Sequence, residues 1–127
     1  LGEKNQKKID TMKATNEALD EGISVTKPGN TADDVAQKFW TVLDKYKIKK
    51  ESRTGYSIGI GYPPDWGEQT LNISKGDKTV LQPNVTFHMI AVMQFGEWGV
   101  EASESVRVTE KGSELFCNLS RELHIKG

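Results

Sequence analysis

Two amphipathic segments open the chain. Residues 4–24 carry apolar side chains at helical spacing, with lysines and acids on most other positions: Ile9, Met12, Leu19 and Ile23. Residues 31–46 repeat the pattern with Val35, Phe39, Val42, Leu43 and Tyr46. An apolar stripe on a helix is typical of a surface helix that buries one side. We therefore predict two helices whose stripes belong to the core.

The link between the two helices carries stop and start signals. Pro28 and Gly29 end the first helix. Thr31 is followed three residues later by Asp34, which resembles a capping box with Asp in place of the usual Glu. The second helix is therefore predicted to begin at Thr31 and to run to about Tyr46.

The stretch 53–68 (RTGYSIGIGYPPDWGE) reads first as a strand and then as a loop. Tyr56, Ile58 and Ile60 alternate with Ser57, Gly59 and Gly61, and a glycine face indicates that backbone or ligand comes close. The adjacent Pro63 and Pro64 cannot continue a strand, and the run DWG predicts a turn. A loop of this composition lines a pocket or, as is more common, serves only as a structural turn.

The remaining pattern predicts an antiparallel sheet. Leu71 and Ile73 indicate a short strand, and the nearly apolar run 85–94 indicates a strand covered on both faces. A hairpin turn at Gly96-Glu97 leads into a partner strand over 98–109. A tail with Leu115, Phe116, Leu119 and Leu123 follows a last turn at Lys111-Gly112. Helices followed by strands give an α+β fold.

Composition narrows the class of protein. The 127 residues, 35% hydrophobic and 28% charged, are typical of one globular domain or of part of one. The formal net charge of −1 without a basic patch argues against a nucleic-acid partner, and no apolar run is long enough to span a membrane. The single cysteine, Cys117, excludes an internal disulfide and indicates a reducing, cytoplasmic compartment. Because the chain opens at Leu1 without a methionine, we expect a piece of a longer protein.

The residues alone carry little chemistry. His88 lies inside an apolar strand, where a hydrogen-bonded core or pocket histidine is the common explanation and a functional role is the alternative. Glu101 and Glu104 are separated by an odd number of positions, so they belong to opposite strand faces and form no carboxylate pair. Glu68 is either a ligand-facing acid or a solvated turn residue. Cys117 has no neighbouring base and reads as a small hydrophobe.

Four motifs, taken together, resemble a known superfamily. They are KPGNTADD (27–34), GYSIGIG (55–61), QPNVTFHMIAVM (82–93) and WGVEASESVRVTEKG (98–112). The order is similar to the second half of the pita-bread fold of methionine aminopeptidase, prolidase and creatinase. The resemblance implies that residues 1–127 are the C-terminal part of a pita-bread catalytic domain without its upstream half. Two helices would pack on a curved antiparallel sheet.

Finer motifs point to one branch of that superfamily. GYPPDWGE (61–68), followed by PNVTFHM and WGVE, is similar to the ectoine hydrolase-like branch, whose members are often labelled Xaa-Pro dipeptidases. In the metal-dependent members, three ligand positions match Tyr56, Ile90 and Ser103 of this chain. Tyrosine is an unusual ligand, isoleucine has no donor atom, and a serine hydroxyl is a poor substitute for a carboxylate. The resemblance therefore implies no metal and no other cofactor; two further ligands, both aspartates, would lie upstream.

The implied function is a metal-free hydrolase that cleaves a C–N bond in a small cyclic or amidine-like compound. His88 would shuttle a proton or donate a hydrogen bond, and Glu101 would bind a cationic group. The substrate-binding candidates are Tyr56, Tyr62, Trp66 and Glu68, with the three aromatic residues as a wall around the cation. The principal acid or nucleophile would lie upstream, so the isolated chain is expected to be inactive.

Two alternatives stay open. One is a metal-dependent Xaa-Pro dipeptidase, against which the missing ligands argue, and the other is a pita-bread module that binds partners without catalysis. Half of such a sheet exposes a strand edge and an apolar face, which predicts a homodimer.

Overall fold

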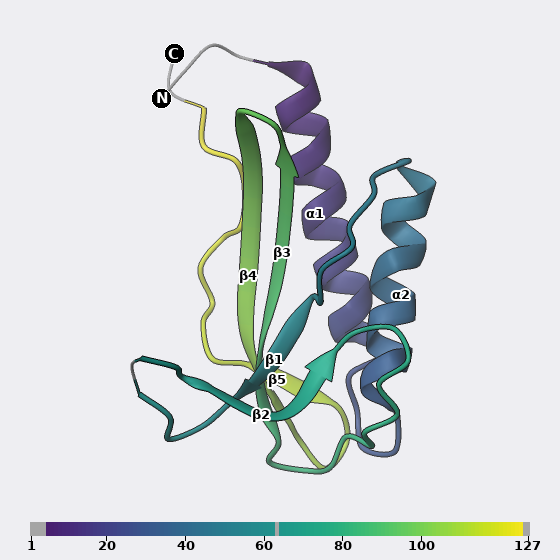
Figure 1. The fold of residues 1–127 in the computed structure, drawn as a ribbon, viewed down its shortest axis with the longest axis vertical. Helices are drawn as coiled ribbons and strands as arrows, with labels where there is room; N and C mark the ends of the chain where they lie inside the picture. Colours follow the sequence, from purple (N-terminus) through teal and green to yellow (C-terminus); the bar gives the residue numbers. More distant parts are fainter. Residues whose placement is uncertain (1–4, 63, 126–127) are drawn as a thin grey trace.

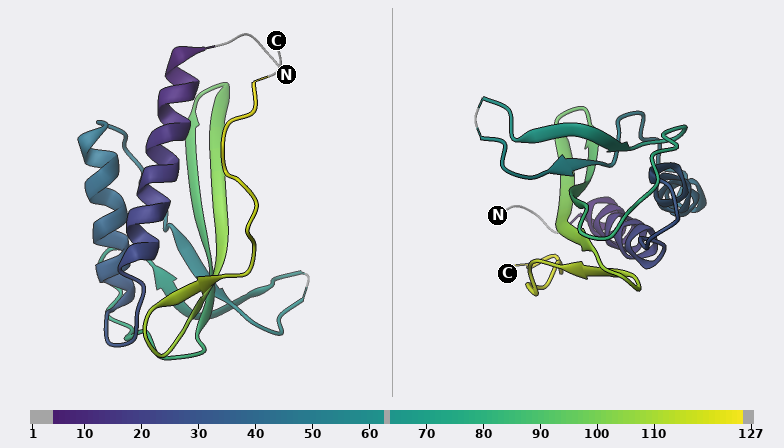
Figure 2. Two further views of the ribbon diagram at one scale, coloured as in Figure 1. Left: turned by 180° about the vertical axis from the view of Figure 1, so that it is seen from behind. Right: turned by 90° about the horizontal axis from the view of Figure 1, so that it is seen from below.

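The computed structural model describes residues 5–62 and 64–125, and within them two helices precede one antiparallel sheet. The elements are α1 (Gln6–Ser24), α2 (Ala32–Lys45), β1 (Gly55–Ile58), β2 (Gly67–Ile73), β3 (Thr86–Phe95), β4 (Trp98–Val108) and β5 (Ser113–Leu115). The strands lie in the order β2-β1-β3-β4-β5, and both helices cover the same side of the sheet (Figures 1 and 2). The predicted α+β layout is confirmed. No helix among the described residues is long and apolar enough to cross a membrane.

Both helices begin at a side-chain cap, of which the sequence predicted only the one at Thr31. The Asn5 side chain accepts a hydrogen bond from the Lys8 backbone N–H at 3.3 Å and caps α1. At α2 the Thr31 hydroxyl accepts from the Asp34 N–H at 3.2 Å, while the Asp34 carboxylate accepts from the Thr31 N–H at 2.7 Å. These reciprocal bonds satisfy two donors that the first turn of a helix leaves free, and they confirm the predicted capping box.

The buried face of α1 differs from the predicted stripe. Leu19 is buried as expected, but Met12 and Ile23 are only partly buried. Small residues make the closest contacts instead, and the fully covered positions of α1 include Ala14, Ala18 and Gly22. A Cβ on Gly22 would lie 2.5 Å from the Met89 Cε atom. The helix therefore approaches β3 through its small residues, which a search for large apolar side chains does not detect.

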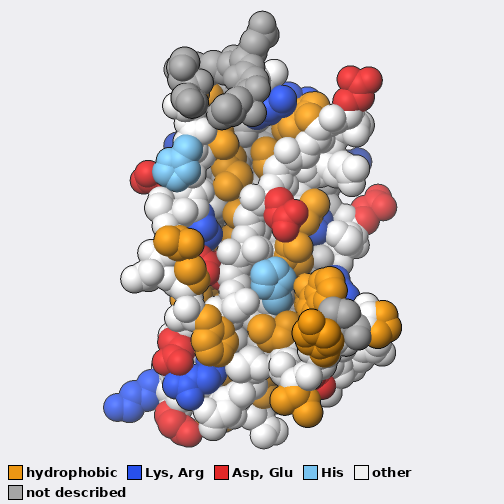
Figure 3. Space-filling view, turned by 90° about the vertical axis from the view of Figure 1, so that its left-hand side faces the viewer, with side chains coloured by type: hydrophobic (Ala, Val, Ile, Leu, Met, Phe, Trp, Pro, Cys, Tyr) orange, Lys and Arg blue, Asp and Glu red, His pale blue; other side chains and the backbone are white. Residues whose placement is uncertain are grey.

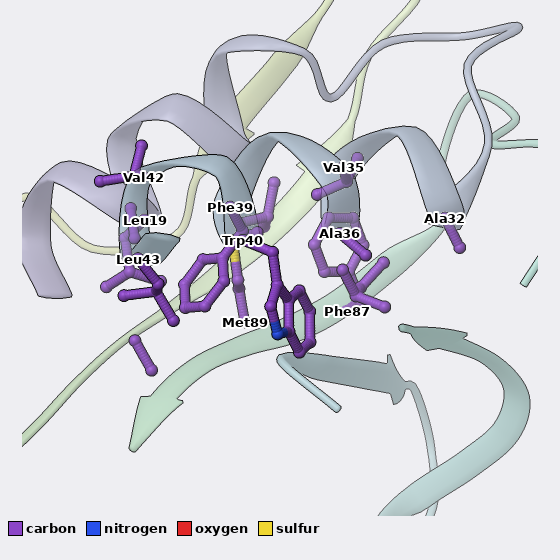
Figure 4. Close-up of a cluster of buried hydrophobic side chains, with 14 of the residues drawn as sticks. Leu19, Ala32, Val35, Ala36, Phe39, Trp40, Val42, Leu43, Phe87 and Met89 are labelled. Atoms are coloured by element: carbon purple, nitrogen blue, oxygen red, sulfur yellow. The ribbon is translucent and has the colours of Figure 1, made fainter. Parts of the chain in front are cut away.

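The core fills the space between α2 and the sheet (Figure 4). Phe39 and Trp40 pack edge to face with ring centroids 5.5 Å apart. Phe87 and Met89 reach the same cluster from β3 and are fully buried. Because complete burial of a large apolar side chain contributes about 1.5–3 kcal/mol, this cluster holds the helices on the sheet.

The β3–β4 hairpin determines which side chains face the open side of the sheet. Phe95 pairs with Trp98 across a two-residue loop, and Gly96 has the positive φ of +61° that such a turn requires. The helix-facing residues of β3 are buried, whereas His88, Ile90 and Val92 on the other face are half-buried. The prediction that this strand is covered on both faces holds for one face only, because both helices lie on that side and the other face is half-buried.

Two strands extend beyond the predicted pattern. β2 begins at Gly67, four residues before Leu71, because the Asp65 carboxylate accepts the Gly67 N–H at 2.9 Å and closes the turn directly before the strand. β5 pairs with the end of β4 through Val106 and Leu115 although its side chains are partly or fully exposed. Because β5 is held by backbone hydrogen bonds and buries no side chain, its sequence does not show the alternation of apolar and polar residues that predicts a strand.

Candidate functional site

Three neighbouring strands bring polar side chains into one row on the open face of the sheet. Tyr56 of β1 pairs with His88 of β3, and His88 pairs with Ser105 of β4. Two residues further along β3, Ile90 lies opposite Ser103. Figure 3 looks onto the side of the molecule away from the helices, where hydrophobic side chains are interspersed with charged groups. Side chains directly opposite each other in antiparallel strands are close enough to interact.

A hollow of about 490 Å³ lies over this row. Its lining residues are Tyr56, Ile58, Gly59, Gly61, Trp66, His88, Ile90, Glu101 and Ser105. Four of the six candidate residues from the sequence thus meet in one place: Tyr56, Trp66, His88 and Glu101. Tyr62 and Glu68 are not among the lining residues, and the Tyr62 side chain is 84% exposed.

His88 is held between two neighbours. Its Nδ1 atom lies 3.3 Å from the Ser105 hydroxyl, and its ring centroid lies 5.6 Å from that of Tyr56. Burial lowers the pKa of the imidazole below its usual value, while the negative charges of Glu101 and Glu104 act in the opposite direction. A lowered pKa leaves the ring neutral at pH 7. His88 is therefore able to accept a proton there.

Tyr56 carries two further contacts. The Trp66 indole Nε1 donates a hydrogen bond to the Tyr56 hydroxyl at 3.1 Å. The Arg53 guanidinium lies over the Tyr56 ring at 4.8 Å from its centroid, and its Nη1 donates to the Asn72 side chain at 2.5 Å. A cation of the substrate would therefore have to compete with Arg53 for this ring.

Glu68 organises the loop that carries Trp66. Its carboxylate accepts the Gly61 backbone N–H at 2.6 Å. A Cβ on Gly59 or Gly61 would lie 3.0 or 3.1 Å from the same carboxylate oxygen. The close approach that the glycines allow is thus made by Glu68 of this chain. The structure places Glu68 as a contact within the loop, beside the hollow.

The two glutamates of β4 lie on opposite faces, as their spacing predicts. Glu101 is exposed and lines the hollow. Glu104 is only 6% exposed and forms an ion pair with the Arg121 guanidinium at 2.8 Å. Arg121 comes from the C-terminal tail, which runs back along β4 (Figure 1). Glu104 therefore ties the tail to the sheet.

Comparison with known proteins assigns the family. A sequence model of metallopeptidase family M24 matches residues 1–110. The chain belongs to metallopeptidase family M24. Ectoine hydrolase of Halomonas elongata is 40% identical over 111 residues, which cover 87% of this chain and 28% of that protein. An uncharacterized hydrolase/peptidase of Sinorhizobium fredii is 41% identical over 110 residues, or 83% of this chain and 26% of that protein. This M24 chain thus spans less than a third of the length of these relatives.

Solved structures confirm the fold. The dipeptidase PepE of Mycobacterium ulcerans superposes with a TM-score of 0.87 at 25% identity, covering 97% of this M24 chain and 33% of its own. The methionine aminopeptidase of Rickettsia prowazekii gives a TM-score of 0.69 at 18% identity, covering 91% and 54%. The architecture is therefore the predicted part of the pita-bread fold.

The family implies bound metal ions, which require ligand side chains on the open face. The three positions matched to metal ligands in the sequence lie on this face as Tyr56, Ile90 and Ser103. Within residues 5–62 and 64–125, no group of three or more His, Cys, Asp or Glu side chains is placed to hold a metal ion. A divalent cation requires imidazole nitrogen or anionic oxygen donors. This part of the M24 chain does not fit such a centre.

Sequence reasoning missed two residues of the site, Ser105 and Arg53. Ser105 was detectable, because a two-residue loop at Gly96-Glu97 determines the pairing and counting outward places Ser105 opposite His88. Arg53 gave no signal, since its position over the Tyr56 ring depends on how the chain enters β1.

Proposed function

We propose that the whole protein is a metal-independent hydrolase that cleaves a C–N bond in a small cyclic or amidine-like compound, as an ectoine hydrolase does. Residues 1–127 form the C-terminal part of its pita-bread catalytic domain. The observation that carries the proposal is the composition of the open face. This face carries Tyr56 and His88, whose side chains are suited to hydrogen bonding and proton transfer. Apolar Ile90 lies opposite Ser103 on the same face, and neither side chain is a good metal ligand.

The likeness to ectoine hydrolase supports this assignment over a peptidase. The chain is 40% identical to ectoine hydrolase but only 25% identical to the dipeptidase PepE, although it superposes well on PepE. The dipeptidase reading requires a metal centre, and the ligand positions on this face lack the donors for one.

The chemistry follows from the groups in the hollow. A water oxygen bonds to the amidine carbon, and one of its protons passes to neutral His88. This leaves a hydroxyl group on the carbon. The C–N bond then breaks with its electron pair remaining on nitrogen, and that nitrogen takes the proton from His88. As the C=O bond forms, the hydroxyl proton also passes through His88 to the leaving nitrogen, so the products of the amidinium cation and water are an amide and an ammonium group. Glu101 binds the cationic amidinium before the reaction, because its carboxylate lines the hollow and is exposed there.

We place the protein in the cytoplasm, because the one cysteine of these 127 residues, Cys117, is unpaired and exposed. Its partners are a small-molecule substrate and a second copy of the protein.

The test compares substrates and metal content in the purified whole protein. Ectoine, creatine and an Xaa-Pro dipeptide are offered separately, before and after treatment with a chelator. We expect turnover of ectoine or creatine that the chelator does not change. Cleavage of the dipeptide alone, with stoichiometric bound metal, would replace this proposal by the peptidase.

Variants then test the residues. His88→Gln and Glu101→Gln are expected to lower kcat/KM by on the order of 10²-fold or more, because each removes a group that acts on the substrate. Glu110→Gln is a matched control, since Glu110 is exposed and lines no part of this hollow. Equal activity of all three variants would place the catalytic groups elsewhere.

A further inference from the structure

The hydrogen bond between Trp66 and Tyr56 has only one possible direction. An indole Nε1–H is a donor and never an acceptor, so the Tyr56 hydroxyl oxygen must accept in this 3.1 Å contact. The hydroxyl proton of Tyr56 then points away from Trp66. Among residues 5–62 and 64–125, no hydrogen-bond acceptor takes that proton. Tyr56 and Trp66 both line the hollow, so a free donor is held at its wall.

A positive charge lies over the ring that carries this donor. The Arg53 guanidinium lies 4.8 Å from the Tyr56 ring centroid, and Asn72 fixes it there. The Asp65 carboxylate in the same loop is already bound by the Gly67 N–H at 2.9 Å and the Gln69 amide at 3.0 Å. A positive charge next to a donor favours an acceptor that carries negative charge. Glu101 lies in the same hollow and has the opposite preference.

We propose that the Tyr56 hydroxyl donates a hydrogen bond to an anionic oxygen of the substrate. Trp66 orients this hydroxyl, and the charge of Arg53 favours the negative oxygen. The hollow is then polarised: its Tyr56 end takes an anionic oxygen, and Glu101 takes the cationic nitrogen. This inference rests on the proposed hydrolase function and assigns Tyr56 the opposite role from that of a wall around a cation.

The anionic oxygen has two possible sources. It is a carboxylate that the substrate already carries, or it is the oxygen delivered by the attacking water, on which negative charge develops as its remaining proton leaves and the C–N bond breaks. A carboxylate contact acts on binding, whereas a contact with the developing charge acts on the chemical step.

The first test needs no turnover. The ¹⁵N–¹H signal of the Trp66 indole is identified in the whole protein with the Trp66→Phe variant. Tyr56→Phe is expected to move this signal, because its hydrogen-bond acceptor is lost, and Tyr62→Phe is the control that removes an exposed hydroxyl. Sodium acetate, compared with sodium chloride at equal ionic strength, is expected to shift the signal in the wild type and less in Arg53→Gln.

The second test separates the two sources. Ectoine is compared with 2-methyl-1,4,5,6-tetrahydropyrimidine, which has the same amidinium ring without the carboxylate. If Tyr56 binds the carboxylate, Tyr56→Phe weakens ectoine binding by about tenfold and leaves binding of the second compound unchanged. If it binds the developing oxyanion, both affinities stay the same and kcat falls by on the order of 10²-fold. If the protein hydrolyses only a dipeptide, Tyr56→Phe is measured on that substrate, whose carboxylate and scissile carbonyl offer the same two acceptors.

Three results would overturn the inference. The first is a Trp66 indole signal that Tyr56→Phe does not move, since the orienting bond would then be absent. The second is equal behaviour of Tyr56→Phe and Tyr62→Phe in binding and turnover. The third is unchanged binding and unchanged kcat in Tyr56→Phe, together with loss of binding of both amidinium compounds in Tyr56→Leu. That result would identify Tyr56 as part of a cation-binding wall.

Discussion

Burial of the His88 imidazole has a consequence for pH that can be measured. Its pKa lies below the usual value of 6.5 in the folded protein, so the unfolded chain takes up this proton first as the pH falls. The folded state should therefore lose stability as the pH decreases below about 6.5, and kcat/KM should stay constant until the pH approaches the lowered pKa. Unfolding experiments and pH–rate profiles of the whole protein measure the two effects.

His88→Gln supplies the comparison, because glutamine cannot take up a proton in this range. In this variant the contribution of position 88 to the pH dependence of stability should vanish between pH 6.5 and the lowered pKa. An identical pH dependence in wild type and variant would show that His88 does not titrate differently on folding.

At the level of single residues, the sequence predicted the kind of contact that a residue makes better than the residue with which it makes that contact. The glycines at 59 and 61 correctly indicated a close approach, but the group that approaches is the Glu68 carboxylate from the far side of the loop. That partner depends on the path through Tyr62 to Trp66, which no local pattern encodes. The opposite faces of Glu101 and Glu104 follow from strand periodicity alone, so spacing was sufficient there.

At the level of elements, the start of α2 provides a direct test. Thr31→Ala removes the hydroxyl that accepts the Asp34 N–H and should lower the free energy of unfolding by about 1 kcal/mol. Thr31→Ser retains the hydroxyl and should keep most of the stability. Urea denaturation at one fixed protein concentration measures the difference as a shift in midpoint with an unchanged slope. Equal loss in both variants would assign the effect to the threonine methyl group.

Elements with strong local signals were predicted to within a few residues, and the others were not. In α2 the capping box and the helical spacing of apolar residues indicate the same helix. In the β3–β4 hairpin the tight turn and the flanking apolar strands indicate the same pairing. β5 exists because the edge of β4 offers unpaired backbone groups, and α1 buries alanines and Gly22 because it lies close to Met89. Both depend on neighbours that are distant in sequence, so local periodicity could not show them.

At the level of the whole molecule, the motifs predicted the fold and family, while the hollow required the structure. Its lining comes from β1, β3, β4 and the loop after β1, so the set becomes visible only when the strand order is known. The motif match nevertheless identified three positions that correspond to metal ligands in the metal-dependent members, and in the structure these positions lie on one face of the sheet. The strand register brings them together, because Tyr56 pairs with His88 and Ile90 pairs with Ser103.

The exposed apolar surface of the 127-residue chain leads to a prediction about assembly. Ile60 is fully exposed and Leu119 is 76% exposed, while Ile90 and Val92 lie half-buried on the open face. The sheet also ends in two edge strands, β2 and β5, whose outer backbone groups are available for pairing. Covering such surface is favourable by about 25 cal/mol per Å² of apolar area, so we expect the chain to form a dimer.

Sedimentation velocity should show a species of twice 14.1 kDa whose fraction rises with concentration. Ile60→Ser and Leu119→Ser, made separately, should indicate which region is covered, because only the variant at the interface weakens association. A single species of 14.1 kDa at every concentration would contradict the prediction and would mean that the open face is stable in water.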